Sequence, residues 1–519
     1  MRKIHIGLAV LLSSFLLLEA IFSLNWPITH DEAPLFYEAF LMRAESRMPY
    51  RDFYDFQMPG AYALFFGIGV ASNFHPISIR MIDLFFLAAL ITFTYFILRN
   101  LGRPAAIAAP VLFGLKYLEG GPSMALQREY LLLFFIVISI WFYQKQEEWK
   151  NKTSSGSVNP NKWNTTLNGI LFMSLAGTCI GIAFMIKPQA ALALVPFLVL
   201  EFSSGNKPRG AAWVKNVAAY LAGFILPVLC VFLWLALTGS LSPFLEIVLR
   251  YWPLYSQVSG QLLVVSGSEH LLLLMDQFWR LGGNALWLLP AGLGLYLIFR
   301  NPNLSWSTRR QVLLLTWMVI VFGIYPATSG QFFQYHYLPF VYFIVLLASL
   351  ALSNSVIPKW NALLFAVLLM VILIEVRPPA AIIQQVEGKS AAAPGGREEK
   401  IAAYLASHLK PGDTVQPLDW TGGALQAMLT TRARLATSFV FDFYFYHHVS
   451  DPYIQGLRSR FLTELQLDPP AYIVEVTSMD KPWISGPDTS HEFSDLEEFL
   501  NENYITAVQR DDYNIYVRR

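Results

Sequence analysis

The sequence has little charge for its length. Asp, Glu, Lys and Arg make up 14% of the 519 residues, whereas 55% are hydrophobic. A soluble globular chain carries roughly 25% charged residues. This composition does not suit a chain surrounded by water, and we interpret the protein as a membrane protein with many spans.

The sequence also lacks net charge and cysteine. Its formal charge is +1, and no cluster of Lys and Arg is interleaved with aromatic residues. A nucleic-acid partner is therefore not expected, because binding it requires a basic field and stacking aromatics. The only two cysteines, Cys179 and Cys230, both lie in apolar runs. This excludes a disulfide framework and a cysteine-based metal site.

Long apolar runs are abundant. Several are long enough to cross a bilayer as helices. We expect an α-helical polytopic protein with about eleven transmembrane helices and a small soluble α/β domain at its C-terminus. The expected spans are residues 4–25, 78–98, 104–118, 128–143, 167–186, 189–203, 214–237, 284–299, 311–327, 337–353 and 360–376. The first resembles a signal peptide, but it lacks a small-residue cleavage site, so we interpret it as a retained span.

The positions of Lys and Arg predict the orientation. If the N-terminus is cytoplasmic, every second loop should be enriched in these residues. Five successive loops on that side carry them: Arg99 and Arg103; Lys145, Lys150, Lys152 and Lys162; Lys207, Arg209 and Lys215; Arg300, Arg309 and Arg310; and Lys359. The remaining loops are then outside the cytoplasm. The apolar stretch 59–74 is short, and we expect an interfacial or re-entrant helix there.

The composition changes near residue 376. We predict a transmembrane domain over residues 1–376, a linker over 377–396 and an extracytoplasmic soluble domain over 397–519. In the last region, REEKIAAYLASHL and SDLEEFLNENY indicate helices, and DTVQPL, AYIVEV and YNIYVRR indicate strands. This alternation is typical of a small α/β module. It has no Gly-rich phosphate loop, so we assign it no nucleotide.

Polar side chains from distant loops share the predicted external side. They are Asp31, Glu32, Arg51, Asp52, Asp55, Arg128, Glu129, Lys187 and His336. The site candidates among them are Asp31, Glu32, Arg128, Glu129, Lys187 and His336. Charged groups at a membrane edge are costly, which favours a paired or functional role. Carboxylates together with cations suit a reaction in which a carboxylate deprotonates a hydroxyl and the cations hold a phosphate leaving group.

Each candidate also has a simpler structural interpretation. Asp31 and Glu32 precede a helical stretch and can cap its free amides. Arg128 and Glu129 can form a local pair at a helix entrance. The stem of Lys187 can extend along the membrane so that its ammonium reaches the interface.

Two further stretches also have a simpler structural interpretation. His336 can be an interfacial histidine beside tyrosines. The stretch PYRDFYDFQMPG can be an aromatic belt with a surface ion pair.

In their order along the chain, several motifs resemble the GT-C class of integral-membrane glycosyltransferases. The similarity is to the group of dolichyl-phosphate-mannose-protein mannosyltransferases and lipid A aminoarabinose transferases. It rests on HDEAPLFYEAF, PYRDFYDFQMPGAY, RMIDLFF, RNLGRP, QREYLLLFF, MIKPQAAL and QYHYLPFVYFIVLLA. These motifs cover roughly the first 350 residues, and the soluble tail is not included.

The resemblance implies an inverting glycosyltransferase that uses a polyprenyl-phosphate-linked sugar on the extracytoplasmic side. It implies that Asp31 is the general base, with Glu32 shaping the site or helping to bind a metal. Glu129 would be the second carboxylate, although many relatives have an aspartate nearby. Lys187, Arg128 and His336 would stabilise the departing lipid phosphate.

The resemblance implies no required cofactor. Metal dependence varies within the class, so a requirement for Mg²⁺ or Mn²⁺ stays open. The acceptor would be a glycan, a lipid or a protein, and the location a bacterial inner membrane. The main alternative is a multi-span transporter, which should show an internal repeat and charged residues near the midplane. A polymerase or ligase of lipid-linked oligosaccharides and a non-catalytic scaffold are further alternatives.

Overall fold

The chain forms two compact units. The computed structural model describes residues 2–154, 162–202, 211–259, 264–265, 267–328, 330–353, 356, 360–378, 396–477 and 486–519. The helical unit comprises Met1–Asn25, Arg80–Val231 and Met275–Lys389; the mixed unit comprises Trp26–Ile79, Phe232–Leu274 and Ser390–Arg519. Residues 379–395 of the predicted linker lie outside the described residues. The predicted domain limits stay a prediction.

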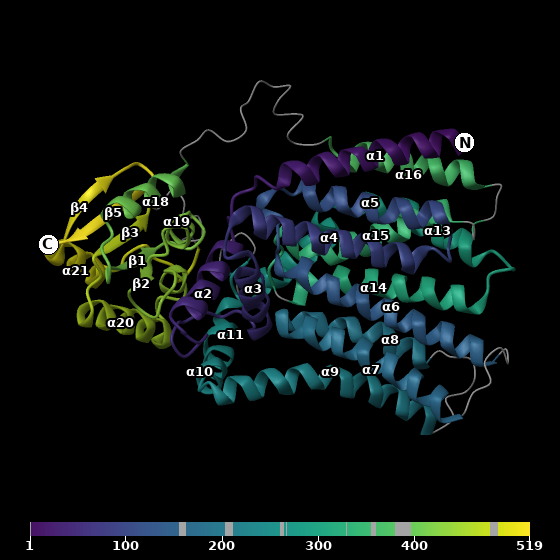
Figure 1. The fold of residues 1–519 in the computed structure, drawn as a ribbon, viewed down its shortest axis with the longest axis horizontal. Coiled ribbons are helices and arrows are strands. Elements are labelled where there is room, and N and C mark those ends of the chain that lie inside the picture. The colour runs from purple at the N-terminus through teal and green to yellow at the C-terminus, as the bar shows by residue number, and fades with distance from the viewer. Residues whose placement is uncertain are drawn as a thin grey trace. The chain divides into compact units, whose positions relative to one another are not determined.

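Long helices build the helical unit (Figure 1). They are α1 (Arg2–Ser23), α4 (Pro76–Leu98), α5 (Arg103–Glu119), α6 (Arg128–Ser154), α7 (Lys162–Ile186), α8 (Leu194–Phe202), α9 (Ala211–Leu237), α13 (Leu288–Phe299), α14 (Trp306–Thr328), α15 (Leu338–Ser349) and α16 (Asn361–Glu375). Short helical turns η1 (Pro122–Met124), η2 (Pro188–Ala193), η4 (Leu281–Gly283), η5 (Ala285–Trp287), η6 (Gln334–Tyr337) and η7 (Leu350–Leu352) connect them. Helices α4 and α9 each have one end in the mixed unit, and the residues of α12 (Gly267–Arg280) are divided between the units.

Five helices in the described part of the chain are long and apolar enough to cross a membrane, and six if one bent pair counts as a single span. They are Pro76–Leu98, Asn168–Ile186, Trp213–Leu237, Trp306–Thr328 and Gln334–Leu352. Shorter apolar helices cover Gly7–Ser23, Pro59–Ser72, Pro188–Phe202 and Asn361–Glu375. The chain is therefore built as an integral membrane protein, and the expected number of eleven spans stays a prediction.

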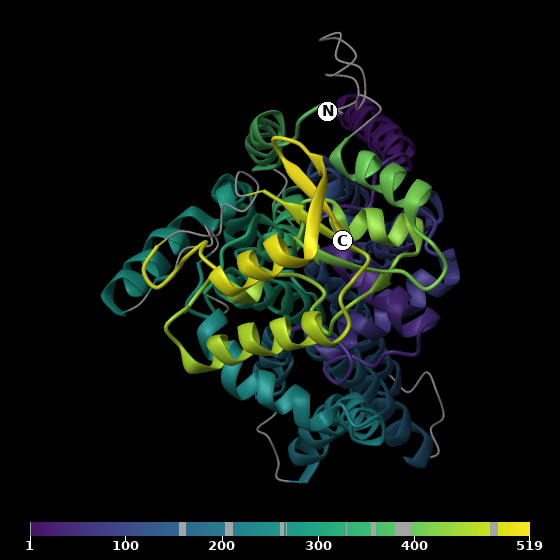
Figure 2. The same cartoon turned by 90° about the vertical axis from the view of Figure 1, so that its left-hand side faces the viewer.

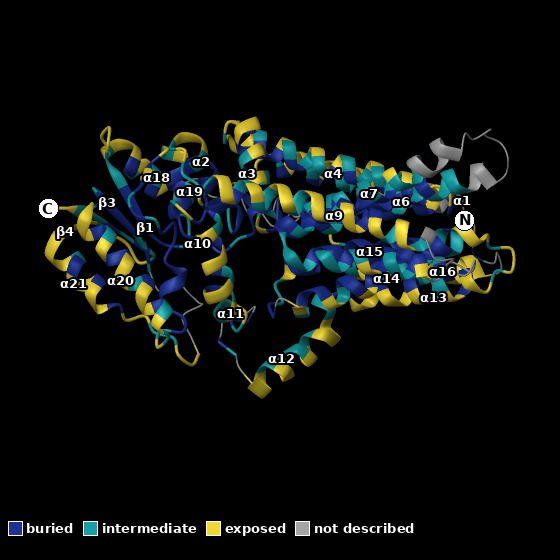
Figure 3. Ribbon diagram, turned by 90° about the horizontal axis from the view of Figure 1, so that it is seen from below, coloured by how far each residue is buried: buried dark blue, intermediate teal, exposed yellow. Residues whose placement is uncertain are grey.

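Two of the spans differ most in burial (Figure 3). The span Gln334–Leu352, which contains α15, is 94% buried inside the protein and packs against α5, α13 and α14. Because other helices of the protein enclose this span on nearly all sides, α15 lies at the centre of the unit. The span Trp213–Leu237 in α9 is only 17% buried, and Leu229, Leu233 and Leu237 are exposed. These side chains suit a lipid-facing surface.

A five-stranded sheet organises the mixed unit. Its strands are β1 (Thr414–Leu418), β2 (Arg434–Leu435), β3 (Tyr472–Val476), β4 (Tyr504–Gln509) and β5 (Tyr513–Arg518), in the order β2-β1-β3-β5-β4. β1 pairs in parallel with β2 and β3, and β5 pairs antiparallel with β3 and β4. The unit's helices are α2 (Glu32–Ala44), α3 (Pro59–Ser72), α10 (Leu241–Glu246), α11 (Trp252–Tyr255), α18 (Arg397–His408), α19 (Ala424–Thr431), α20 (Pro452–Leu467) and α21 (Ser494–Asn503). The π-helical turn η3 (Ile247–Tyr251) and the 3₁₀ turn η9 (Phe443–Phe445) complete it.

The C-terminal prediction of two helices and three strands is confirmed by α18, α21, β1, β3 and β5. The sequence reading missed α19, α20, β2 and β4. The loop after β1 contains Gly422 and Gly423, but its amides do not form an anion site. The Asp419 carboxylate already accepts hydrogen bonds from the backbone N–H groups of Gly422 at 2.8 Å and Ala424 at 2.9 Å.

The segment that carries the HDE motif belongs to the mixed unit. Helix α2 packs against α19, and the Tyr37 hydroxyl donates to the Ala433 carbonyl oxygen at 2.8 Å. Arg47 donates to the carbonyl oxygens of Thr437 and Leu435 at 3.2 and 2.9 Å. The segment that begins with the HDE motif is therefore held by the C-terminal domain.

Candidate active site

Three of the predicted residues meet in the helical unit. Glu129 lies in the first turn of α6, Lys187 lies between α7 and η2, and His336 lies in η6. Helix α7 ends at Ile186 because Pro188 disfavours helical backbone in the residue before it, and Lys187 is extended at φ −154°. The extended backbone at Lys187 separates α7 from η2, and the side chain reaches α6.

Glu129 is the centre of this cluster. Its side chain is fully buried, and its Oε1 forms an ion pair with the Lys187 ammonium. His336 Nε2 lies 3.4 Å from the same oxygen, and the Tyr325 hydroxyl donates to it at 3.4 Å. Glu129 Oε2 is buried and has no hydrogen-bond partner among the described residues. One carboxylate oxygen is thus engaged by protein groups and the other is not.

Lys187 and His336 contact each other directly. Lys187 Nζ lies 2.8 Å from His336 Nε2, and His336 Nδ1 lies 2.7 Å from the Gln331 carbonyl oxygen. A carbonyl oxygen can only accept, so Nδ1 carries the proton and donates. Nε2 is then the acceptor of a hydrogen bond from Lys187. The imidazole in this arrangement is neutral, and it orients the ammonium together with Glu129.

The ammonium of Lys187 is enclosed by aromatic rings as well. It lies 5.9 Å from the ring centroids of both Tyr325 and Tyr335, within the range of cation–π attraction. The Lys187 side chain is only 14% exposed. The charge of Lys187 is therefore held inside the cluster, and the position of this cluster relative to the membrane interface stays a prediction.

Arg128 is the first residue of α6 and is 8% exposed. The alternative that Glu129 serves only a local pair with Arg128 does not describe the site, because Glu129 pairs with groups 58 and 207 residues further along the chain, Lys187 and His336.

Asp31 and Glu32 lie in the mixed unit, at the start of α2. Asp31 occupies the N-cap position, but its side chain makes no capping hydrogen bond. Its Oδ1 lies 3.1 Å from His30 Nδ1 instead. Glu32 Oε1 accepts from the backbone N–H of Thr29 at 3.1 Å. The capping interpretation is therefore wrong for Asp31, whereas Glu32 does stabilise the turn before the helix.

Both of these carboxylates are buried, at 7% exposure for Asp31 and 2% for Glu32. Burying a charged group is costly unless it is paired. Glu32 is satisfied by the local turn, and Asp31 contacts an ionisable histidine. This neighbour makes Asp31 the better placed of the two to exchange a proton.

A second polar cluster lies around Asp55 in the mixed unit. The sequence places Asp55 with the other polar residues of the predicted external side but assigns it no role in the site. Asp55 Oδ2 accepts from the Tyr62 hydroxyl at 2.5 Å, and Oδ1 accepts from the Tyr444 hydroxyl at 3.2 Å. Burial and the nearby Asp55 carboxylate raise the pKa of Tyr444 well above its usual value, so this phenol stays a donor. The motif PYRDFYDFQMPG does contain a surface ion pair, Arg51–Asp52, with nitrogen–oxygen distances of 2.7 and 2.8 Å.

Within the described ranges, no group of three or more His, Cys, Asp or Glu residues could hold a metal ion. At Glu129 the ammonium of Lys187 engages one carboxylate oxygen, and its positive charge would repel a divalent cation at the other. The residues of this cluster therefore do not fit Mg²⁺ or Mn²⁺.

No protein-family model matches the sequence, and no curated protein matches it. Solved structures do match. ArnT from Cupriavidus metallidurans in the apo state has a TM-score of 0.58 and 12% identity, covering 98% of this chain and 97% of its own. The same protein bound to undecaprenyl phosphate has a TM-score of 0.57 and 12% identity, covering 98% of both chains. The chain has the GT-C fold.

Another GT-C structure, with a lower TM-score, matches the same share of this chain. Archaeal oligosaccharyltransferase AglB from Archaeoglobus fulgidus, in complex with an inhibitory peptide and a dolichol-phosphate, has a TM-score of 0.51 at 13% identity. The alignment covers 98% of this chain and 74% of AglB. The GT-C resemblance inferred from the motifs is thus confirmed at the level of the fold, and it extends over the C-terminal domain, which the motifs did not cover.

Proposed function

We propose that this protein is an inverting glycosyltransferase that moves a sugar from a polyprenyl-phosphate donor to an acceptor hydroxyl outside the cytoplasm. The observation that carries the proposal is the buried cluster of Glu129, Lys187 and His336 on a GT-C fold. A buried ammonium is a pre-oriented charge in a medium of low dielectric constant, where it stabilises a developing anion strongly. ArnT bound to undecaprenyl phosphate supports the class of donor.

In the proposed reaction, the acceptor oxygen attacks the anomeric carbon on the face opposite the phosphate. The bond between this carbon and the phosphate oxygen breaks, and its electron pair stays on the departing lipid phosphate. Asp31 takes the acceptor's hydroxyl proton, and Glu32 shapes the site. Lys187 and Arg128 stabilise the phosphate, and His336, whose Nε2 accepts a hydrogen bond from Lys187, acts through that lysine. Glu129 is the second carboxylate, and its ion pair gives it the further task of orienting Lys187.

The proposed topology follows the loop charges. We propose eleven spans in a bacterial inner membrane, with a cytoplasmic N-terminus and an extracytoplasmic C-terminal domain. A lipid-linked donor keeps its tail in the bilayer, so transfer outside the cytoplasm needs no soluble nucleotide sugar. The acceptor is a glycan, a lipid or a protein.

The test is transfer of radiolabelled sugar by the purified full-length protein in detergent. The donors form a panel of polyprenyl-phosphate-linked sugars, each assayed with and without added Mg²⁺ or Mn²⁺. Wild type is compared with Asp31→Asn and with Asp511→Asn, an exposed aspartate of the mixed unit. Loss of a general base should lower the rate by about a hundredfold to ten-thousandfold, and Asp511→Asn should match wild type.

Two results would contradict the proposal. Asp31→Asn turning over donor at the rate of Asp511→Asn would remove Asp31 from the chemistry. Donor moving across a proteoliposome bilayer without release of lipid phosphate would favour the transporter instead.

A further inference from the structure

A polar groove lies in the C-terminal domain, and none of the site residues assigned above lines it. It encloses about 920 Å³ and is lined by α20, α21 and neighbouring loop residues. In Figures 1 and 2 the two helices lie side by side, α20 in yellow-green and α21 in yellow. The volume falls in the range of small-molecule sites. Unlike a typical drug-like pocket, its wall is mostly polar.

Helix α20 presents neutral hydrogen-bonding groups to the groove. Gln455, Ser459 and Thr463 follow one another at intervals of four residues, so they lie on one face of the helix, and Gln466 continues the row. Amides and hydroxyls both donate and accept hydrogen bonds. This wall can therefore match a ligand of mixed polarity.

Helix α21 presents carboxylates to the same space. Asp495, Glu498 and Glu502 lie on one face, with Phe499 among them. Ionised carboxylates only accept hydrogen bonds. A ligand on this side must supply donors, and a polyanion such as a phosphorylated glycan would be repelled.

Arg458 lies between the two walls. Its guanidinium is 4.6 Å from the centroid of the Phe493 ring, and its Nε donates to the Phe445 carbonyl oxygen at 2.8 Å. Arg458 itself lines the groove and is half-buried. The groove therefore has a cation held beside an aromatic ring, together with the row of acceptors on α21.

We propose that this groove binds an uncharged oligosaccharide. A sugar hydroxyl donates and accepts at once, so adjacent hydroxyls can donate to the carboxylates of α21 while accepting from Arg458 and the α20 amides. The apolar C–H face of a sugar ring suits Phe493 and Phe499. A cationic peptide would use only the carboxylates and would leave Arg458 and the amides unmatched. None of the proposed catalytic residues lines the groove. The proposal that it binds an oligosaccharide therefore does not depend on the proposed transfer reaction.

The test uses the full-length protein in nanodiscs with fluorescently labelled probes. Maltohexaose, chitohexaose and mannohexaose are the neutral probes, with hexagalacturonate and hexalysine as the charged comparisons. Asp31→Asn is the background, so that binding is read without turnover. Fluorescence anisotropy is measured at low salt and at about 0.5 M NaCl, where surface charges are largely screened.

The matched variants are Thr463→Trp and Leu467→Trp. Both positions are exposed on α20, but Thr463 lines the groove and Leu467 does not. At least one neutral hexasaccharide should bind with a Kd of about 0.1–1 mM at both salt concentrations. Thr463→Trp should weaken this binding at least tenfold and Leu467→Trp should leave it unchanged.

Three results would overturn the proposal. They are the absence of binding by every neutral probe, equal binding by both tryptophan variants, and tight binding of hexalysine that disappears at high salt. Loss of sugar transfer in Asp31→Asn with intact oligosaccharide binding would confirm that the two sites are separate.

Discussion

The ion pair between Lys187 and Glu129 links the stability of the helical unit to the proposed chemistry. Lys187→Met should destabilise the protein by about 3–5 kcal/mol, because it leaves the fully buried Glu129 carboxylate without its cation. The double variant Lys187→Met/Glu129→Gln removes both charges and should recover most of that stability. The free energy of unfolding is measured by denaturant titration in mixed micelles.

Transfer activity distinguishes a purely structural role of the ion pair from a role of Lys187 in stabilising the leaving phosphate. If Lys187 stabilises the leaving phosphate, both variants should lose activity by about a hundredfold or more, whatever their stability. A double variant that regained wild-type transfer would show that the pair is structural only.

The sequence predicted that these charges share one side of the membrane, but not their pairing. Lys187 and Glu129 are 58 residues apart, and Lys187 and His336 are 149 apart. Loop position follows from counting spans. The end of α7 is readable from Pro188, which disfavours helical backbone at Lys187. How η6 turns, and therefore which side chains meet, is not readable from a residue pattern.

At the scale of helix pairs, α7 and α9 approach closely through small residues. Gly177 and Gly181 form a GxxxG motif on α7, and a Cβ at Gly177 would collide with the carbonyl oxygen of Tyr220 on α9. Thr178 donates a hydrogen bond to the Gly223 carbonyl oxygen at 3.2 Å. Such close packing is the usual basis of helix association in membranes, where the hydrophobic effect contributes little.

Gly177→Ala should therefore destabilise the helical unit by about 1–3 kcal/mol through overpacking. Gly169→Ala on the same helix is the matched control, because a Cβ there meets nothing within 4 Å. The control should be neutral or stabilising by up to about 1 kcal/mol. Unfolding in mixed micelles is the measurement. Equal effects at the two glycines would contradict the close approach.

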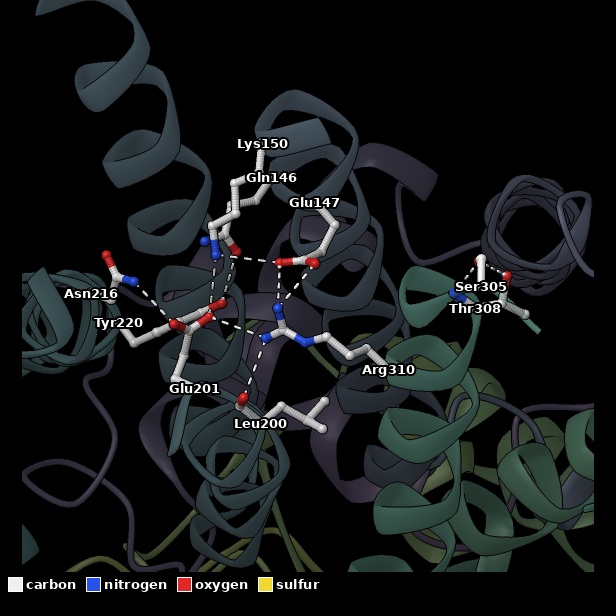
Figure 4. Close-up of polar contacts among 10 residues, drawn as sticks. All are labelled: Gln146, Glu147, Lys150, Leu200, Glu201, Asn216, Tyr220, Ser305, Thr308 and Arg310. Atoms are coloured by element: carbon white, nitrogen blue, oxygen red, sulfur yellow. Dashed lines mark hydrogen bonds and ion pairs between the residues drawn. The ribbon is translucent and has the colours of Figure 1, made fainter. Parts of the chain in front are cut away.

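A second element-scale feature is the buried ion network that joins α6, α8, α9 and α14 (Figure 4). Arg310 donates to both carboxylate oxygens of Glu147 at 3.1 Å and lies 3.6 Å from Glu201. Lys150 lies 3.3 and 3.6 Å from the same two carboxylates. Asn216 on α9 donates to Glu201 at 3.0 Å.

Arg310 and Lys150 contribute unequally to this network. The Arg310 side chain is 8% exposed and that of Lys150 is 39% exposed. Arg310→Met should cost about 3–5 kcal/mol, because the buried Glu201 and the 13% exposed Glu147 would share one partly exposed cation. Lys150→Met should cost at most about 1 kcal/mol. A loss at Lys150 as large as that at Arg310 would contradict this reading of the burial.

The same network shows what loop charge can and cannot predict. Arg310 counts as a topological signal in the sequence, yet in the structure it is a buried member of α14 that binds two other helices. Lys207, Arg209 and Lys359, predicted on the same side, lie outside the described residues.

For the whole molecule, apolar runs predicted most of the long helices, because burial in lipid requires both length and continuous hydrophobicity. The C-terminal sheet was partly predicted. β1, β3 and β5 have β-branched and aromatic residues, whereas β2 has only two residues, Arg434 and Leu435, and exists through pairing with β1. Asp31 was a candidate because of its place in a predicted external loop, and its role as general base was inferred from a resemblance. Its place beside the C-terminal domain depends on contacts such as Tyr37 with Ala433, which are 396 residues apart.

At the scale of the whole molecule, we predict the orientation of the chain in the membrane. Because the sequence has only two cysteines, this orientation can be tested by labelling single introduced cysteines. Replacing Cys179 and Cys230 by serine gives a background for single cysteines at exposed sites, Ser407 in α18 and Asn303 in the loop between α13 and α14. A maleimide that does not cross membranes should label Ser407→Cys in intact spheroplasts, and Asn303→Cys only after lysis. The opposite pattern would place the C-terminal domain in the cytoplasm, where an extracytoplasmic transfer reaction could not use it. The pattern of loop charges orients all spans together, so if one cysteine is labelled from the unexpected side, the other should be as well. Labelling of both cysteines from the same side would mean that an even number of spans lies between them.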